Sequence, residues 1–506
     1  MVDDEKAIGF ASSHAEVDSI EACVRPYGPR LLRLFWRIVQ PCYPILHKKT
    51  FAAHYSESYR NLDAGLLGAV YLNAIHWWSH DSVLSPLQKP NTVALRRLTQ
   101  QVIQNSYHRP RLSSIEAILL LLQCKPEDAL NPDHTFVWGY VSQALAIAEC
   151  LGLHLDASEW TIPDWEKSLR KRLSWALYMQ DKWAALAYGR PSHIQDDQDW
   201  CVQDLTESDF VDYGNSPEEM EDDSAPPRNE AADPDLIFTH MIELTKFLST
   251  ILRTFYSARA STNQDTTHLF YKAQPILDQL SAWHSKLSPA LSMDAWKPRQ
   301  LCSAGNVHFA YYGLQMTILR RLVRSTTLAP LCQDHDILAA IRQAGRRVAE
   351  DTTTFIGNLR PDHTEAFWYS TTPYLFSVTG SFLTLLLVTS LSMPERTHWR
   401  ESLKTFLWNL RLRCKAFESM RYAVDRLEGA ILRGLEHALA VDLDESPGFV
   451  MQRSRGDGGP DQDFMPSDAG NWDFTAVDLE AFDWLNAFDS RGNGLADLEV
   501  YEQVGL

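Results

Sequence analysis

The sequence predicts an all-α protein, and three observations carry that prediction. Apolar residues recur at alternating spacings of three and four along most of the chain, which is the period of an amphipathic helix. Alternating period-two runs, which mark half-buried strands, are nearly absent. Hydrophobic residues make up 45% of the 506 residues, which is too much apolar material for a mainly disordered chain and enough for an extensive core.

The expected helices follow from this spacing and from the residues that start or stop a helix. The segment beginning at Leu31 stops before Pro41, and the segment beginning at Val137 stops at Gly152. The same spacing predicts further helices up to a long final one that begins at Trp399. The expected ranges, in chain order, are 31–39, 115–122, 137–151, 161–189, 236–256, 269–287, 307–323, 337–356, 374–392 and 399–439.

Charge is distributed unevenly, and this defines the expected domain organisation. The formal net charge is −18, and residues 441–506 alone carry 15 acids and three bases. A second acidic stretch, 203–235, contains several prolines and is expected to be an exposed linker or insertion. We therefore expect an N-terminal tail over 1–24, a multi-helix domain over 25–440 that includes the acidic insertion, and a largely disordered acidic C-terminal tail over 441–506.

The charge balance and the cysteines limit the class of function. A chain this acidic lacks the clustered basic surface that non-specific duplex binding requires, so any contact with DNA has to be local or supplied by another module. The eight cysteines are never closer than 19 positions in the sequence, which excludes the usual zinc ribbons and fingers. No secretory leader follows Met1, so we expect a reduced intracellular protein.

The longest uncharged run lies between Glu365 and Glu395, and it has the length of a membrane span. It contains Pro373 and many serine and threonine residues, and no basic cluster flanks it. These features favour a buried core helix over a membrane span. We therefore expect no contact with a membrane.

The most distinctive segment covers residues 158–200. Thr161 and Asp164 have the spacing of a capping box, and Gly189 is expected to end the helix that follows. Glu166 and Arg170 are four residues apart and are expected to pair on the outer side of this helix. One face is expected to be buried, and its residues are Trp165, Leu169, Leu173, Ala176, Gln180, Trp183 and Ala187.

Two features of this segment leave alternatives open. The basic residues of the helix favour a solvated face, with a nuclear import signal or a DNA-contacting patch as the alternatives. These residues are Lys167, Arg170, Lys171 and Arg172. Arg190, directly after Gly189, is expected to hold a neighbouring carboxylate, Asp181 or Asp199, and so to fix the turn. A structural role is therefore preferred for Arg190.

The sequence gives little support for an enzymatic function. It contains no GxSxG elbow, no P-loop, no GxGxxG after a strand and no HExxH. The aspartates at 196, 197 and 199 form one aspartate-rich motif, but the second motif of a metal-dependent isoprenoid enzyme is missing. Four histidines lack ligand spacing and are interpreted as capped or core residues, namely His47, His154, His193 and His240. We therefore predict no catalytic residue, no cofactor-binding residue and no metal ligand.

Three sequence blocks carry a resemblance to a known family. The block WEKSLRKRLSWALYMQDKW, the following GRPSHI and the earlier FWRIVQPCYPILHKKTF resemble the regulatory middle homology domain of fungal-specific transcription factors. Within that family, the sequence of these blocks is most similar to the co-activator of GABA and allantoin utilisation and its relatives. The resemblance covers residues 25–440 and weakens after residue 260. Its signature positions are Trp165, Arg170, Trp175, Gln180, Asp181, Trp183, Gly189, Arg190 and Pro191.

The resemblance implies a nuclear, helical regulator of a fungal metabolic pathway, with another transcription factor or a second copy of the chain as its partner. Members of the family read DNA through an N-terminal binuclear zinc cluster of six closely spaced cysteines, which this sequence does not contain. DNA contact is therefore expected to be indirect or to come from a missing N-terminal module, and zinc is expected only with that module. The alternative is a non-activating dimerisation partner of a complete zinc-cluster factor.

The acidic tail contains a candidate activation segment at residues 471–489. The segment carries five acids, five aromatic residues and no base, with apolar residues at helical spacing. Such a segment stays solvated until its apolar face enters a hydrophobic groove on a partner. The residues expected to enter a co-activator groove are Phe474, Val477, Phe482, Trp484, Leu485 and Phe488. A C-terminal helix docked on the chain's own body is the alternative, and the glycine-rich stretch 455–460 favours the tethered segment.

Overall fold

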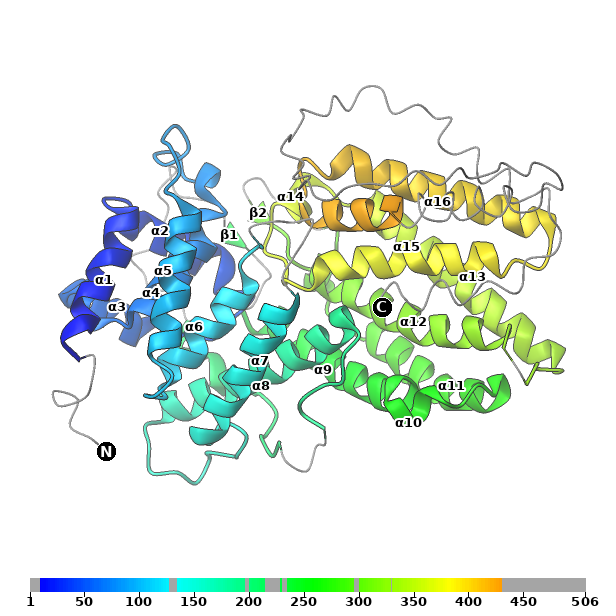
Figure 1. Cartoon of the computed structure of the whole chain (residues 1–506), viewed down its shortest axis with the longest axis horizontal. Helices are drawn as coiled ribbons and strands as arrows, with labels where there is room; N and C mark the ends of the chain where they lie inside the picture. Colours follow the sequence, from blue (N-terminus) through cyan, green and yellow to red (C-terminus); the bar gives the residue numbers. More distant parts are fainter. Residues whose placement is uncertain are drawn as a thin grey trace, which may run out of the picture. The chain divides into compact units, whose positions relative to one another are not determined.

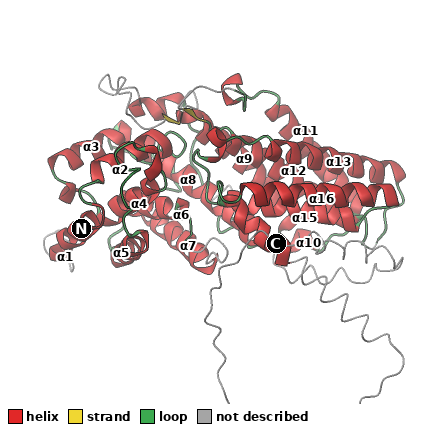
Figure 2. Cartoon of the chain, turned by 90° about the horizontal axis from the view of Figure 1, so that it is seen from above, coloured by secondary structure: helices red, strands yellow, loops and turns green. Residues whose placement is uncertain are grey.

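The computed structural model describes residues 10–126, 134–195, 200–213, 228–229, 234–294, 300–328 and 330–429. Internal contacts divide the chain after residue 424, and the account below concerns the unit that precedes this division. Within the described residues the unit consists of α-helices, a few short 3-10 and π-helical turns and two strands of two residues each (Figure 2). The predicted all-α fold is confirmed.

The first half of the unit is a group of helices around one central helix (Figure 1). Its helices are α1 (Phe10–Val24), α2 (Gly28–Leu34), α3 (Lys48–Glu57), α4 (Ala64–Ile75), α5 (Thr92–Asn105), α6 (Leu112–Gln123), α7 (His134–Cys150) and α8 (Asp164–Tyr188). Helix α4 carries no charged residue, and all of its residues are buried, as expected of a helix that is apolar on every side. Helices α1, α5 and α6 pack against it.

The second half is arranged around α12 in the same way. Its elements are α9 (Pro234–Ile251), a π-helical turn (Leu252–Tyr256), α10 (Ala258–Ser261), α11 (Thr266–His284), α12 (Gly305–Ser325), α13 (His335–Gly357), α14 (Pro361–Thr364), α15 (Thr372–Val388) and α16 (Met393–Arg413). Helix α12 packs against α9, α13 and α15, and α16 lies on the far side of α15 (Figure 1). The strands β1 (Arg228–Asn229) and β2 (Gln300–Leu301) pair in parallel.

The two halves are joined by buried polar contacts as well as by the packing of α8 on α9. The indole nitrogen of Trp77 donates to the carbonyl oxygen of Glu365 at 2.8 Å. The hydroxyl of Tyr369 donates to the carbonyl oxygen of Cys42 at 2.6 Å. Because each contact pairs a group from the first half with a group more than 280 positions later, the halves form one unit rather than two consecutive domains.

The N-terminal stretch differs from the expected tail, because residues 10–24 form α1. Val17, Ile20 and Val24 are buried, and the hydroxyl of Tyr71 on α4 donates to the Glu21 carboxylate at 2.7 Å. The helical domain therefore begins before residue 25. The three apolar positions are too short a run to stand out in the sequence, and contact with α4 decides their structure.

The long helix expected over 399–439 is interrupted. Helix α16 ends at Arg413, and the chain turns before a further helical segment begins at residue 419. In the turn Phe417 is 3% exposed and packs against the rings of Trp368 and Phe376, with ring centroids 5.4 and 5.8 Å away. Burial of this aromatic ring therefore accompanies the break.

Helix α15, expected over 374–392, ends at Val388. Within the described part of the chain, no helix is long and apolar enough to cross a membrane.

The acidic stretch 203–235 is only partly described. Its first residues form a 3-10 turn, Glu207–Tyr213, that contacts α8 and α9. Asp209 in this turn is 7% exposed and forms a 3.0 Å ion pair with Lys171 of α8. These residues are therefore packed on the domain and do not act as a linker. Residues 214–227, the acidic tail 441–506 and the candidate activation segment 471–489 lie outside the described residues.

Candidate functional site

The signature segment forms α8, which begins at Asp164 and ends at Tyr188. The predicted capping box is absent, because Pro163 occupies the N-cap position and no side chain caps the helix. Gly189 follows in the left-handed conformation, with φ of 61°, and its N–H donates to the carbonyl oxygen of Ala185. This conformation favours glycine, so the predicted end of the helix is confirmed.

The buried face of α8 matches the predicted buried face at every position except the first. Leu169, Leu173, Ala176, Gln180, Trp183 and Ala187 are buried. Trp165 is 37% exposed and stacks on the ring of His47, with centroids 4.6 Å apart. Trp165 therefore lies at the margin of the core and not within it.

Side-chain hydrogen bonds connect this face to four other parts of the fold. The indole nitrogen of Trp183 donates to the hydroxyl of Thr245 on α9 at 2.9 Å. Trp175 donates to the carbonyl oxygen of Gln203 at 2.9 Å. Gln180 accepts from Gln123 of α6 at 2.9 Å, and Gln123 in turn accepts from the backbone N–H of Ser370. The signature helix is therefore the element at which α6, α9 and two distant segments meet.

Three of the four basic residues named in the prediction are engaged in the fold, which differs from the expected solvated face, whereas Lys167 forms a surface ion pair with Asp164 at 3.5 Å. Arg170 pairs with Glu166 at 2.9 Å, as predicted, and also donates to the carbonyl oxygen of Leu151 at 2.8 Å. Lys171 pairs with Asp209 as described above. The side chain of Arg172 is fully buried. This part of α8 therefore presents no open basic patch for DNA.

A buried carboxyl group lies close enough to Arg172 to be influenced by its charge. Glu116 of α6 is 7% exposed. Burial and, to a smaller extent, the charge of Asp63 outweigh the opposing charge of Arg172 and raise the pKa of Glu116 to about 8. At neutral pH much of the Glu116 population is therefore uncharged, which lowers the cost of burying it.

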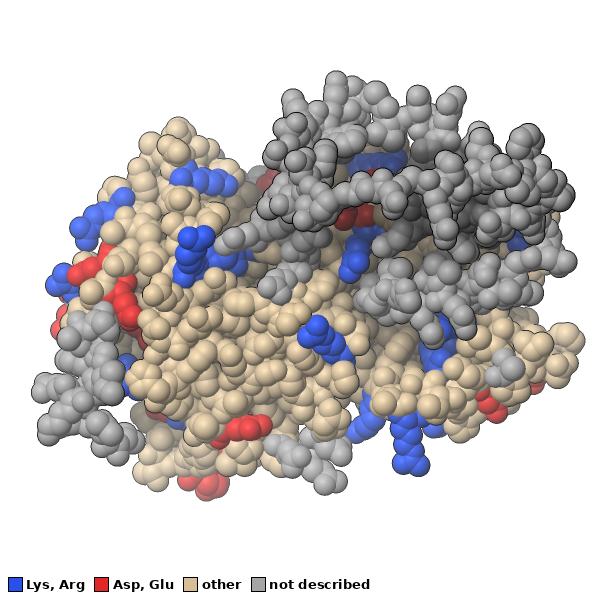
Figure 3. All heavy atoms as spheres, viewed as in Figure 1, with Lys and Arg blue, Asp and Glu red and all other residues tan. Residues whose placement is uncertain are grey.

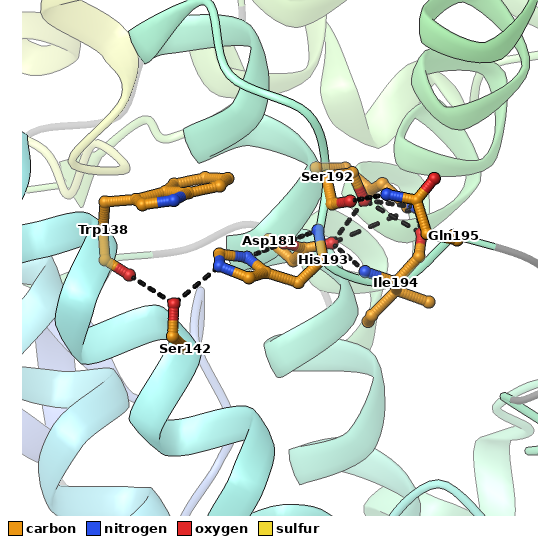
Figure 4. Close-up of polar contacts among 8 residues, drawn as sticks. Trp138, Ser142, Asp181, Ser192, His193, Ile194 and Gln195 are labelled. Carbon is orange, nitrogen blue, oxygen red and sulfur yellow. Dashed lines mark hydrogen bonds and ion pairs between the residues drawn. The ribbon is translucent and has the colours of Figure 1, made fainter. Parts of the chain in front are cut away.

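The turn after α8 is held by Asp181, whose side chain is fully buried (Figure 4). Oδ1 accepts from the backbone N–H of His193 at 3.0 Å and lies 2.9 Å from the ring nitrogen Nδ1 of the same residue. Oδ2 accepts from the hydroxyl of Ser192 at 2.5 Å and from the backbone N–H of Ile194 at 3.1 Å. One carboxylate thus fixes three consecutive residues of the turn.

The electrostatics of this carboxylate reflect its partners. Burial by itself would raise the pKa of Asp181, but the hydrogen bonds from His193 and Ser192 outweigh burial and hold the pKa below its usual range. Lys182 adds a positive charge, with Nζ 4.0 Å from Oδ2. The same ammonium donates to the hydroxyl of Ser192 at 2.7 Å and to the carbonyl oxygen of Ile194. The buried charges are therefore paired and hydrogen-bonded.

The hydrogen bonds continue from the turn to α7. Nε2 of His193 lies 2.6 Å from the hydroxyl of Ser142, and this hydroxyl also donates to the carbonyl oxygen of Trp138 at 3.1 Å (Figure 4). The order Ser142, His193 and Asp181 is that of a serine hydrolase triad. Here, however, the ring of Trp138 stacks on the imidazole at 4.1 Å, and the serine bonds to its own helix. The arrangement links α7 to α8 through the turn, and we assign it a structural role.

Arg190 does not pair with Asp181, the first of its two expected partners. The four donors from the turn occupy Asp181, and the guanidinium of Arg190 lies over the ring of Trp138, 5.8 Å from its centroid. The other expected partner, Asp199, lies outside the described residues. Pro191 is exposed. The residues that fix the turn are therefore Ser192, His193 and Ile194. The only sequence signal for them was the adjacent pair of polar residues Ser192 and His193 in the GRPSHI block.

In the described part of the chain, no group of three or more histidine, cysteine, aspartate or glutamate residues has the arrangement of a metal site. Within the described residues, the eight cysteines are not joined by disulfides. Of the histidines interpreted as capped or core residues, His47 is buried and accepts from the N–H of Thr50 at the start of α3. Nδ1 of His240 instead lies 2.7 Å from the carboxylate of Glu243.

Comparison with known proteins identifies the class. The profile of the fungal specific transcription factor domain matches residues 32–293, and this range includes α8 and its turn. The chain belongs to this family, whose members are transcription regulators and not enzymes.

Three curated relatives are similar to the chain over different lengths. The transcriptional activator protein DAL81 of Saccharomyces cerevisiae is 30% identical over 84% of this chain and 46% of its own length. An uncharacterized transcriptional regulatory protein of Schizosaccharomyces pombe is 30% identical over 46% of this chain and 33% of its own length. The acetamidase regulatory protein of Aspergillus fumigatus is 25% identical over 69% of this chain and 41% of its own length. The chain thus spans less than half the length of these relatives, and no solved structure shows a significant match.

Proposed function

We propose that the chain is a nuclear regulator of transcription for a fungal metabolic pathway. The observation that carries the proposal is the similarity to a transcriptional activator over 84% of the chain. The described structure supports a regulatory domain, because hydrogen bonds of the signature helix join it to distant segments of the chain. In this proposal the domain presents surfaces to other proteins.

DNA contact is assigned to another module or to a partner. On the face drawn in Figure 3, the lysine and arginine side chains lie in separate places and do not form one continuous surface. Duplex binding requires such a surface, or a dedicated reading module, to neutralise several phosphates together. Because the chain carries a formal net charge of −18, we assign DNA binding to an N-terminal zinc module or to a complete transcription factor bound to this chain.

Activation is assigned to the acidic tail. The aromatic residues of 471–489 enter a hydrophobic groove on a co-activator, while the acids keep the free segment solvated. This step is tested by fusing the full chain to a heterologous DNA-binding domain and measuring a reporter gene. Replacing Phe474, Trp484 and Phe488 together by alanine should abolish activation, because buried aromatic anchors carry most of the energy of short interfaces.

A matched control keeps this experiment specific. Phe464→Ala removes an aromatic residue of the same tail outside the segment and should leave the reporter unchanged. Asp478→Asn combined with Asp483→Asn should reduce activation only in part, because the acids act through solvation and encounter rate. An inert fusion, or one that is indifferent to the triple substitution, would favour the alternative of a non-activating partner of a zinc-cluster factor.

A further inference from the structure

Helix α16 has two stripes of side chains on opposite sides. The buried stripe faces α15 and consists of Trp399, Leu403, Phe406 and Leu410. The opposite stripe is exposed along its whole length and consists of Glu401, Thr405, Trp408, Leu412 and Lys415, the last of these in the turn that follows the helix. Its spacing of four, three, four and three is the period that allows two helices to pair along a seam. We call this second stripe the outer seam.

The centre of the outer seam is apolar. Trp408 is 58% exposed and Leu412 is 62% exposed. They are four residues apart, so their side chains lie next to each other on the helix surface. Exposed aromatic side chains of this kind are the usual anchors of protein interfaces.

The ends of the outer seam carry opposite charges at equal separations in sequence from its centre. Glu401 lies seven residues before Trp408, and Lys415 lies seven residues after it. In an antiparallel pair of identical helices related by a two-fold axis at Trp408, Glu401 of each protomer faces Lys415 of its partner. The seam is therefore complementary to itself, which is the property of an interface between two copies in two-fold symmetry.

We propose that the outer seam of α16 binds a second copy of this chain in an antiparallel, two-fold symmetric helix pair. The two Trp408 rings meet at the axis, and two Glu401–Lys415 ion pairs close the ends. Lys404, which pairs with Glu401 of its own helix at 3.3 Å, lies opposite Leu412 of the partner and covers it with its aliphatic stem. The ion pairs fix direction and register, and the apolar centre supplies most of the affinity.

This inference narrows the partner in the proposed function to a second copy of the chain. Its test is nevertheless separate, because a monomeric chain can still regulate transcription. A single helix pair is small compared with the ~1,600 Å² of a standard interface, so the dimer belongs to the weak, reversible class.

Sedimentation velocity of the purified full chain tests the proposal, over a concentration series on the order of 1 to 100 µM, where weak complexes dissociate. The wild-type chain should pass from monomer to dimer across the series. Trp408→Glu should raise the dissociation constant at least ~10-fold, since it places two carboxylates at the axis. Tyr271→Glu, at a 66% exposed aromatic residue of α11, is the matched control and should dimerise like the wild type.

Charge exchange tests the antiparallel register. Glu401→Lys and Lys415→Glu should each weaken the dimer, because each places like charges opposite each other twice. The double variant should recover most of the lost affinity, since the pairs are restored with reversed sign. Circular dichroism should show the same helix content in all variants, because the substituted side chains are exposed.

Three results would overturn the proposal. The first is a wild-type chain that stays monomeric at every concentration. The second is a dimer that survives Trp408→Glu, which would place the interface elsewhere. The third is a monomeric chain whose reporter activity is nevertheless lost in Trp408→Glu, because the face would then belong to a different protein.

Discussion

Among the carboxylates of α8, Asp181 is the one that holds the turn after the helix. Its replacement by asparagine tests how much this contact contributes to stability. The substitution keeps the size of the side chain and one acceptor oxygen, so two of the four contacts survive. If the amide nitrogen replaces Oδ2, it faces the backbone N–H of Ile194, a residue only 7% exposed. The variant therefore loses two charge-assisted hydrogen bonds and leaves a donor buried without an acceptor.

The size of the effect follows from these losses. A hydrogen bond to a charged group contributes about 1.5 to 3 kcal/mol, and breaking one member of a buried charged network costs about 3 to 5 kcal/mol. We expect Asp181→Asn to lower the free energy of unfolding by about 3 to 5 kcal/mol, mainly because Lys182 and the turn donors lose their common partner. Urea unfolding followed by circular dichroism measures this difference.

Asp164→Asn on the same helix is the matched control. The Asp164 side chain is 99% exposed, and its contact with Lys167 is a surface ion pair of 3.5 Å. It should change the free energy of unfolding by less than about 1 kcal/mol. If Asp181→Asn were no more destabilising than this control, the assignment of Asp181 as the support of the turn would be wrong.

The lowered pKa adds a pH dependence to the same prediction. The pKa of Asp181 in the folded chain lies below its ordinary value of 3.8, because hydrogen bonds from His193 and Ser192 outweigh the effect of burial. Its stabilisation is therefore present above pH 3.8 and is lost as the pH falls through the folded-state pKa. The difference in unfolding free energy between wild type and Asp181→Asn should be constant near neutral pH and should shrink below pH 3.8.

Substitutions at two further positions test the signature segment. Trp183→Ala should lower the free energy of unfolding by about 3 to 5 kcal/mol by leaving a cavity between α8 and α9, whereas Trp183→Phe, which loses mainly the bond to Thr245, should cost about 1 to 2 kcal/mol. Wild-type urea midpoints in both would contradict the burial of this ring. Gly189→Ala should cost about 1 kcal/mol, because alanine is strained at a φ of 61°. A thermal melt equal to that of the wild type would show that the turn does not require the left-handed conformation.

The sequence by itself determined the features that depend on neighbours along the chain. Helical period identified the all-α class and the buried seam of α8 from Leu169 to Ala187. The pair of Glu166 and Arg170 followed from a spacing of four, and the end of the helix followed from the conformational freedom of Gly189. Each of these is a local property, because it involves residues within one or two helical turns of each other.

Only the tertiary structure decided which distant groups meet. Asp181 was one of two expected partners of Arg190, yet it binds Ser192, His193 and Ile194. Arg170 and Lys171 of α8 are paired and Arg172 is buried, where a solvated face was expected. Residues 10–24 became a helix through contact with α4. The physical reason is the same in each case: a charged or apolar side chain has several possible partners in the sequence, and the packing of helices selects the one that is close enough to satisfy it when buried.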